Sequence, residues 1–87
     1  MITVQQLLDA KPDRVVTVAE EVSVQNALEL MARHKISALP VVSGSRLAGI
    51  VSERDYIRKA VPKRVAPWDI MVREIMTRDV FTVGRSD

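Results

Sequence analysis

Leu47-Ala48-Gly49-Ile50-Val51-Ser52-Glu53-Arg54-Asp55 is a short apolar run that ends at a serine and passes into a charged, helix-like segment. Ser52 and Asp55 stand three residues apart at this boundary. Such a pair can form a capping box, in which each side chain accepts a hydrogen bond from the other residue's backbone N–H. Beside the unpaired N–H groups of a helix start, the same pair can also hold a ribose and its phosphate. The stretch therefore predicts a strand, a helix, and a cap or a nucleotide contact between them.

The residues before this stretch predict a β-hairpin. An apolar run over residues 37–42 is followed by the turn Ser43-Gly44-Ser45, and residues 46–51 return as the paired strand. Pro40 has no N–H to donate, so we expect its strand at an edge of the sheet or beside a ligand. Gly49 inside the returning strand predicts a bulge or a close approach of another group.

Apolar spacing predicts a helix on either side of this hairpin. Ser23 is the expected N-cap of the first helix, which should end near Arg33 or His34, where positive charge suits a helix C-terminus. The second helix should span residues 53–60 and stop at Val61-Pro62. Its apolar side chains are expected to face inward, namely Tyr56, Ile57 and Ala60.

The N-terminal segment predicts a short helix and a strand. Val4, Leu7 and Leu8 have the i, i+3, i+4 spacing of an amphipathic helix, which Lys11-Pro12-Asp13 should stop. Residues 14–18 are rich in β-branched side chains, which favours a strand.

These two elements recur near the C-terminus, which indicates an internal repeat. Residues 72–76 have the apolar spacing of residues 4–8, and residues 79–83 resemble residues 14–18. We therefore expect a complete motif over residues 1–60, a linker over 61–69, and the start of a second, truncated motif over 70–87. The alternative is two unrelated helix-strand pieces.

Composition excludes several classes of protein. With 47% hydrophobic and 28% charged residues, the sequence is that of a globular domain. It has no cysteine and one histidine, His34, so we expect no metal ligands, no catalytic residues and no enzyme activity. No apolar run approaches the roughly 20 residues that span a bilayer, and a cytoplasmic protein without a membrane partner is expected.

Positive charge gathers in one segment although the net charge is only +2. Residues 54–64 hold five basic side chains against Asp55 alone. Such a cluster can attract the phosphate of a small ligand or of a nucleic acid, or it can be a solvated helix face.

The order of these elements resembles the CBS (cystathionine β-synthase) motif. The resemblance rests on Ile36-Ser37-Ala38-Leu39-Pro40-Val41-Val42 and on Gly49-Ile50-Val51-Ser52-Glu53-Arg54-Asp55. Ile75-Met76-Thr77 is similar to the usual start of a second motif. The resemblance implies an α+β fold: a small three-stranded sheet packed against two helices, with an N-terminal helix and a partial second repeat.

The resemblance also implies a regulatory module. Members of this family usually pair two motifs as a Bateman module and bind AMP, ATP, S-adenosylmethionine or NAD between them. Carried over by position, Asp55 would bond the ribose hydroxyls, Ser52 the ribose or phosphate, and Arg54 a phosphate. The remaining contacts would hold the adenine, and they are Thr17, Val18, Ile36, Ser37, Ala38 and Pro40.

The second motif is incomplete within this sequence, so we expect another chain to supply the missing half of the pocket as a homodimer. The protein that such a module would regulate is not indicated. One alternative is a purely structural dimerisation unit with a vestigial pocket. A nucleic-acid-binding module is less favoured because only Trp68 lies near its basic residues, which would be Arg58, Lys59, Lys63 and Arg64.

Overall fold

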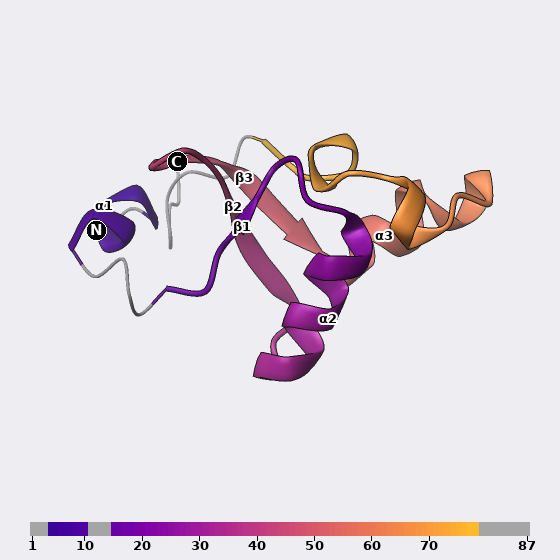
Figure 1. The fold of residues 1–87 in the computed structure, drawn as a ribbon, viewed down its shortest axis with the longest axis horizontal. Coiled ribbons are helices and arrows are strands. Elements are labelled where there is room, and N and C mark those ends of the chain that lie inside the picture. Colours follow the sequence, from indigo (N-terminus) through magenta and orange to yellow (C-terminus); the bar gives the residue numbers. More distant parts are fainter. Residues whose placement is uncertain (1–3, 11–14, 79–87) are drawn as a thin grey trace, which may run out of the picture.

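The computed structural model describes residues 4–10 and 15–78 (Figure 1). Its main elements are α1 (Val4–Ala10), β1 (Val18–Ala19), α2 (Val24–His34), β2 (Ala38–Ser43), β3 (Arg46–Ser52) and α3 (Glu53–Lys59). Short 3₁₀ turns lie at Val61–Lys63, Pro67–Asp69 and Val72–Glu74. The predicted α+β fold with a three-stranded sheet is confirmed. The described residues include no helix that is long and apolar enough to cross a bilayer.

β2 is the central strand of the sheet, which has the order β1-β2-β3. The edge position predicted for this strand is therefore wrong. Ile50, the partner of Pro40 on β3, uses both its N–H and its C=O to pair with Thr77, which lies on the side of β3 away from β2. Ile50 therefore needs no hydrogen bond from Pro40, and the central strand tolerates a residue without an N–H. Pro40 and Ile50 thus form a non-hydrogen-bonded pair, and the nitrogen of Pro40 points away from β3. On that side β1 begins only at Val18, opposite Val41.

The same proline explains why β1 is short. The strand predicted over residues 14–18 is wrong for 15–17, since β1 spans only Val18–Ala19. Pro40 has no N–H to extend the parallel ladder towards the chain before Val18. Val15 packs instead with Leu8 and Leu47 in a small cluster beneath α1. Residue 14 and the predicted stop signal at residues 11–13 lie outside the described residues.

The hairpin forms as predicted, and both of its glycines have a structural reason. Gly44 has φ 63°, which suits the first position of a two-residue turn. Between Val41 and Val42 the register shifts, so β3 contains a bulge next to Gly49. A Cβ on Gly49 would run into the backbone carbonyl of Thr77. The close approach at Gly49 is therefore that of the chain's own backbone.

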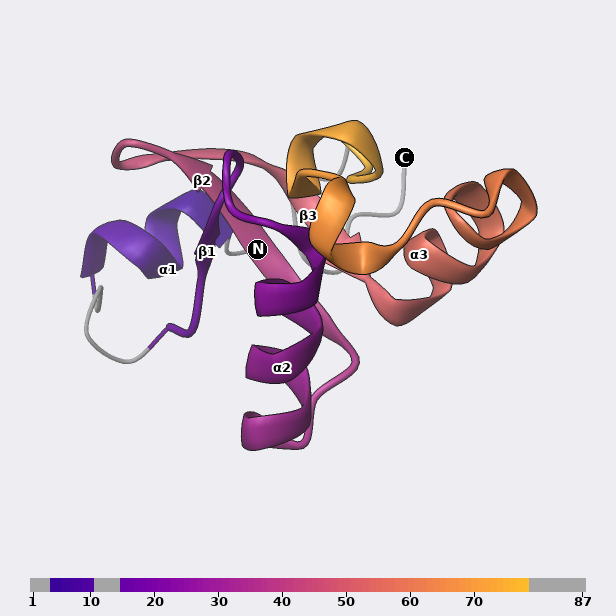
Figure 2. The same cartoon turned by 45° about the vertical axis from the view of Figure 1, so that its right-hand side comes forward.

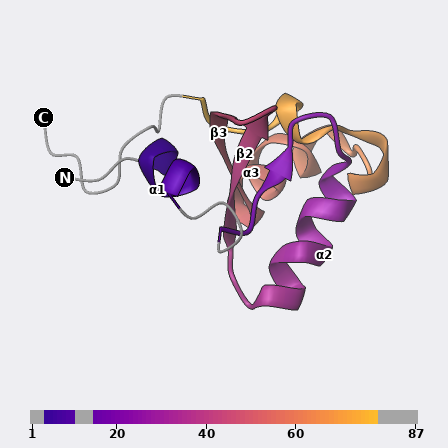
Figure 3. The same cartoon turned by 60° about the vertical axis from the view of Figure 1, so that its left-hand side comes forward.

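The main core lies between the sheet and α2, while α1 covers the opposite face (Figure 3). Ser23 caps α2 as predicted, with its Oγ accepting from the Asn26 N–H at 3.1 Å, and the helix ends at His34. Apolar side chains buried between α2 and the sheet include Val24, Ala27, Met31, Leu39, Val41 and Val51.

α3 lies at the end of the sheet away from α1 (Figure 2), and none of its residues is buried. Tyr56 packs partly against the core, and Ala60, which caps the helix, is fully buried. Ile57 is 60% exposed, so its predicted inward orientation is wrong. Tyr56 and Ala60 are four residues apart and make one stripe, whereas Ile57 lies about 100° round the helix from Tyr56. Among the described residues, no element covers that side of α3.

Residues 70–78 complete the same core. Val72, Ile75 and Met76 are buried in it. The segment that repeats the spacing of α1 forms only the 3₁₀ turn Val72–Glu74, because the backbone is fixed on both sides: the Val24 N–H donates to the Ile70 carbonyl at 2.8 Å, and Thr77 pairs with β3. The strand expected over residues 79–83 lies outside the described residues.

Candidate ligand-binding site

An open hollow of about 550 Å³ lies where β2 begins and β3 ends. Its lining consists of Ser37, Ala38, Ser52, Glu53, Arg54, Ile57 and Arg58. The hollow therefore brings together four of the predicted site residues. Ser37 and Ala38 lie around the start of β2, and Ser52 and Arg54 lie around the start of α3.

Hairpin pairing is what makes these segments meet. Ala38, the first residue of β2, lies opposite Ser52, the last residue of β3. The Glu53 N–H then donates to the Ser37 carbonyl at 3.2 Å. Since both contacts depend on the hairpin register, the bulge at Gly49 helps to decide which side chains face the hollow.

Ser52 and Asp55 form the capping box that their spacing predicts. The Asp55 N–H donates to Ser52 Oγ at 3.1 Å, and the Ser52 N–H donates to Asp55 Oδ2 at 2.8 Å. Ser52 Oγ also lies 3.0 Å from Asp55 Oδ2, to which its hydroxyl donates. The cap therefore positions the Ser52 side chain at the rim of the hollow.

Asp55 does not line the hollow, because its carboxylate is engaged elsewhere. Its Oδ1 accepts from the Thr77 hydroxyl at 3.4 Å and lies 3.7 Å from Lys59 Nζ. Lys59 in turn donates to the Ile75 carbonyl at 2.8 Å. Thr77 was not among the predicted site residues, and Lys59 was named only for the alternative nucleic-acid-binding module. The signal for Thr77 was Gly49, whose missing side chain admits the Thr77 backbone beside β3.

The other predicted contacts are dispersed. Val18 is a core residue, Pro40 is half-buried within β2, and Ile36 is exposed just before the strand. Thr17 lines a separate hollow of about 340 Å³ beneath α1, together with Leu8 and Val42 among others. The structure thus does not bring Thr17 to the hollow beside Ser52.

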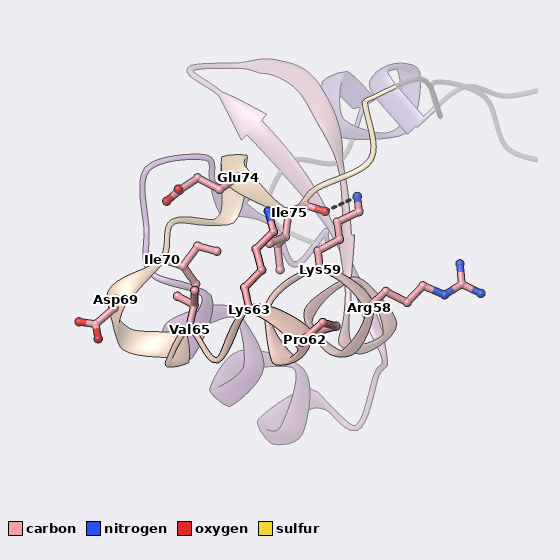
Figure 4. A pocket seen from close by; sticks show the side chains of 9 residues that line it. All are labelled: Arg58, Lys59, Pro62, Lys63, Val65, Asp69, Ile70, Glu74 and Ile75. Atoms are coloured by element: carbon pink, nitrogen blue, oxygen red, sulfur yellow. Dashed lines mark hydrogen bonds between the residues drawn. The ribbon is translucent and has the colours of Figure 1, made fainter.

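A further hollow of about 620 Å³ lies between α3 and residues 61–75 (Figure 4). Pro62, Val65 and Ile70 are among its apolar lining residues. Two of its charged side chains are already used: Lys59 bonds the Ile75 carbonyl, and Glu74 accepts from the Met71 N–H at 2.8 Å. The other charged side chains that line this hollow are Arg58, Lys63 and Asp69, so it presents both signs of charge.

Arg58 lines both this larger hollow and the hollow beside Ser52. Figure 4 shows its guanidinium turned away from the other side chains of the larger hollow. Arg54 stands one helical turn before it. Neither guanidinium forms an ion pair or a hydrogen bond with another described residue. The hollow beside Ser52 therefore has two available cations and one carboxylate, that of Glu53.

The described residues hold no group of three or more side chains that could bind a metal ion. The hollow offers hydroxyls at Ser37 and Ser52, apolar surface at Ala38 and Ile57, and guanidinium groups from α3. This combination suits a ligand with a hydrogen-bonding sugar, an apolar face and an anionic group.

Two curated proteins contain a segment that is similar in sequence to this chain. The chain is 44% identical over 71 residues to the inosine-5'-monophosphate dehydrogenase of Korarchaeum cryptofilum, covering 80% of this chain but 13% of that enzyme. It is 41% identical over 87 residues to the homoserine O-acetyltransferase of Methanocorpusculum labreanum, covering 99% of this chain and 16% of the relative. The chain thus spans about one-seventh of the length of these two curated relatives.

Solved structures of other proteins share the architecture of this chain. A protein with CBS domains from Burkholderia ambifaria shares 46% identity and a TM-score of 0.73, over 90% of this chain and 60% of that one. A CBS-domain protein from Agrobacterium tumefaciens shares 33% identity and a TM-score of 0.69, over 88% and 58% of the two chains. The CBS domain family itself matches residues 12–61, more than half of the sequence. The chain therefore belongs to the CBS domain family.

Proposed function

We propose that this chain is a non-catalytic regulatory module that binds an adenosyl ligand of the AMP, ATP, S-adenosylmethionine or NAD type in the hollow beside Ser52. The observation that carries the proposal is the convergence of Ser37, Ala38, Ser52 and Arg54 on that hollow. These residues come from two segments on which the resemblance to the family also rests.

The hollow's chemistry supports this ligand class. The Ser37 and Ser52 hydroxyls can donate to and accept from a ribose or phosphate, and Ala38 and Ile57 offer apolar contact to a base. Asp55 does not line the hollow, and its contact with a ribose stays a prediction. A ligand that reached Asp55 Oδ1 would replace the 3.4 Å contact from Thr77.

A second copy of the chain would close the hollow, which is open to solvent on its own. Two large apolar side chains near it support this step: Ile36 is 39% exposed and Ile57 is 60% exposed. In a two-fold contact each copy would cover the other's hollow. A ligand held between two copies can regulate a partner protein only by binding one arrangement of the pair more tightly than another.

A purely structural pairing unit with a vestigial pocket is the second candidate. It is favoured by one observation: both carboxylate oxygens of Asp55 are already engaged within the chain, with Ser52, Thr77 and Lys59. Calorimetry distinguishes the two functions.

The test is isothermal titration of the dimeric protein with AMP, ATP, S-adenosylmethionine and NADH. The proposal expects at least one of them to bind with a submillimolar Kd. Ser37→Ala should raise the Kd of that ligand by about 3- to 10-fold through the loss of one hydrogen bond. Ser43→Ala, at the other end of β2, is the matched control and should bind like the natural sequence. Failure of all four ligands in a dimeric sample would favour the structural pairing unit.

A further inference from the structure

Two arginines on one face of α3 set the charge of the candidate site. Arg54 and Arg58 are one helical turn apart, both line the hollow beside Ser52, and neither pairs with another described residue. The hollow's one acidic lining residue is Glu53. The site therefore presents net positive charge to whatever enters it.

Arg58 belongs to this hollow by geometry. It also lines the larger hollow, but there its guanidinium is turned away from the other lining side chains (Figure 4). Lys59, the next residue, is different, because its Nζ is held by the Ile75 carbonyl at 2.8 Å. Of these two adjacent cations, Arg58 is thus the one whose charge is available to a ligand.

We infer that the hollow selects adenosyl ligands that carry phosphate over S-adenosylmethionine, and that Arg58, together with Arg54, determines this specificity. The inference rests on the proposed function and narrows its ligand class. A guanidinium offers paired N–H donors that match phosphate oxygens. S-adenosylmethionine has one carboxylate against a sulfonium and an ammonium group, so its net charge is positive and the two arginines would attract it less than they attract a phosphate.

The physical consequence is an affinity that depends on phosphate and on salt. In an open hollow the interaction is partly screened by solvent, and the Debye length of about 10 Å at 0.1 M salt falls to about 3 Å at 1 M. Each added phosphate should therefore strengthen binding at low salt, and the gain should shrink at high salt. Adenosine should bind with little dependence on salt.

The experiment titrates adenosine, AMP, ATP, S-adenosylmethionine and inorganic tripolyphosphate into the natural protein, Arg54→Gln, Arg58→Gln and Arg46→Gln at low and high salt. Arg46 lies at the hairpin end of β3, so its variant makes the same change in net charge away from the hollow. Thermal unfolding of each variant confirms that it is folded.

We expect ATP to bind about 10-fold or more tighter than adenosine at low salt, from charge-assisted bonds to two guanidinium groups. S-adenosylmethionine should bind no tighter than adenosine. Arg58→Gln and Arg54→Gln should each lower the affinity for ATP about 5- to 10-fold and leave the affinity for adenosine unchanged. Arg46→Gln should change neither affinity.

The outcomes separate this inference from the proposed function. Equal binding of adenosine, ATP and S-adenosylmethionine would support the proposed function and overturn the phosphate selection. Arg58-dependent binding of tripolyphosphate without binding of any adenosyl compound would support the anion site and overturn the proposed function. An ATP affinity that Arg58→Gln does not change overturns the role of Arg58, and no binding of any compound overturns both.

Discussion

Ser52 has two roles, one in the cap of α3 and one in the lining of the hollow. Towards the helix it caps α3 together with Asp55, and towards solvent it lines the hollow with Ser37. The two roles are compatible, because the cap fixes the serine side chain in one place at the hollow's rim. A ligand would therefore meet a hydroxyl that is already oriented.

The capping box should be measurable as stability. Asp55→Ala removes the acceptor of the Ser52 N–H and the contact from Thr77, so the free energy of unfolding should fall by about 1–2 kcal/mol. Glu53→Ala, in the same helical turn but exposed and without such a bond, should cost no more than about 0.5 kcal/mol. Urea denaturation measures both, and equal losses would contradict a structural role for Asp55.

Gly49 and Gly44 are glycines for different reasons, and alanine should separate them. At Gly49 the added Cβ would meet the Thr77 backbone, which cannot rotate away as a side chain could. We therefore expect Gly49→Ala to lower the free energy of unfolding by more than about 2 kcal/mol through overpacking. At Gly44 nothing lies within 4 Å, and the cost is that of a positive φ alone, about 1 kcal/mol. Thermal or urea unfolding compares the two. A Gly49→Ala protein as stable as Gly44→Ala would contradict the packing of Thr77 against β3.

At the scale of elements, the length of an element was harder to predict than its place in the sequence. β1 is short because Pro40 gives it no donor, and residues 72–74 form a 3₁₀ turn because the chain is fixed on both sides of them. Neither cause is local to the element concerned. Local pattern therefore indicated where elements occur, whereas their neighbours determined how far each one extends.

The contribution of residues 70–78 to the core can be tested with two isoleucines. Ile75 is 1% exposed and Ile57 on α3 is 60% exposed. Ile75→Ala should reduce the free energy of unfolding by about 2–4 kcal/mol, because it leaves a cavity. Ile57→Ala should cost less than about 0.5 kcal/mol at protein concentrations where the chain is monomeric.

The same pair of variants, unfolded at high protein concentration, reports on whether α3 is covered. A larger loss for Ile57→Ala at high concentration than at low would place Ile57 in a contact between copies. No loss for Ile75→Ala under either condition would show that residues 70–78 are not packed as described.

At the scale of the whole molecule, the open hollow and the exposed Ile36 and Ile57 predict a pair of chains. Sedimentation or light scattering at micromolar concentration should give a dimer. Ile57→Glu should shift it towards monomer, because it puts a charge into the apolar contact. Val61→Glu is the comparison on the turn after α3, where 49% of the residue is exposed, and it tests whether the contact extends beyond the hollow. A folded monomer of the natural sequence at these concentrations would contradict the prediction.

The sequence by itself determined the family, the hairpin, the N-caps of α2 and α3, and four of the residues that line the hollow, Ser37, Ala38, Ser52 and Arg54. These features depend on spacing within a few residues, where turn chemistry, capping and apolar period act locally. Only the tertiary structure decided that Asp55 faces Thr77, that Thr17 lies at a different hollow, and that Ile57 is exposed. Each of these depends on which distant segment packs beside the residue, and the pattern around a residue does not contain that information.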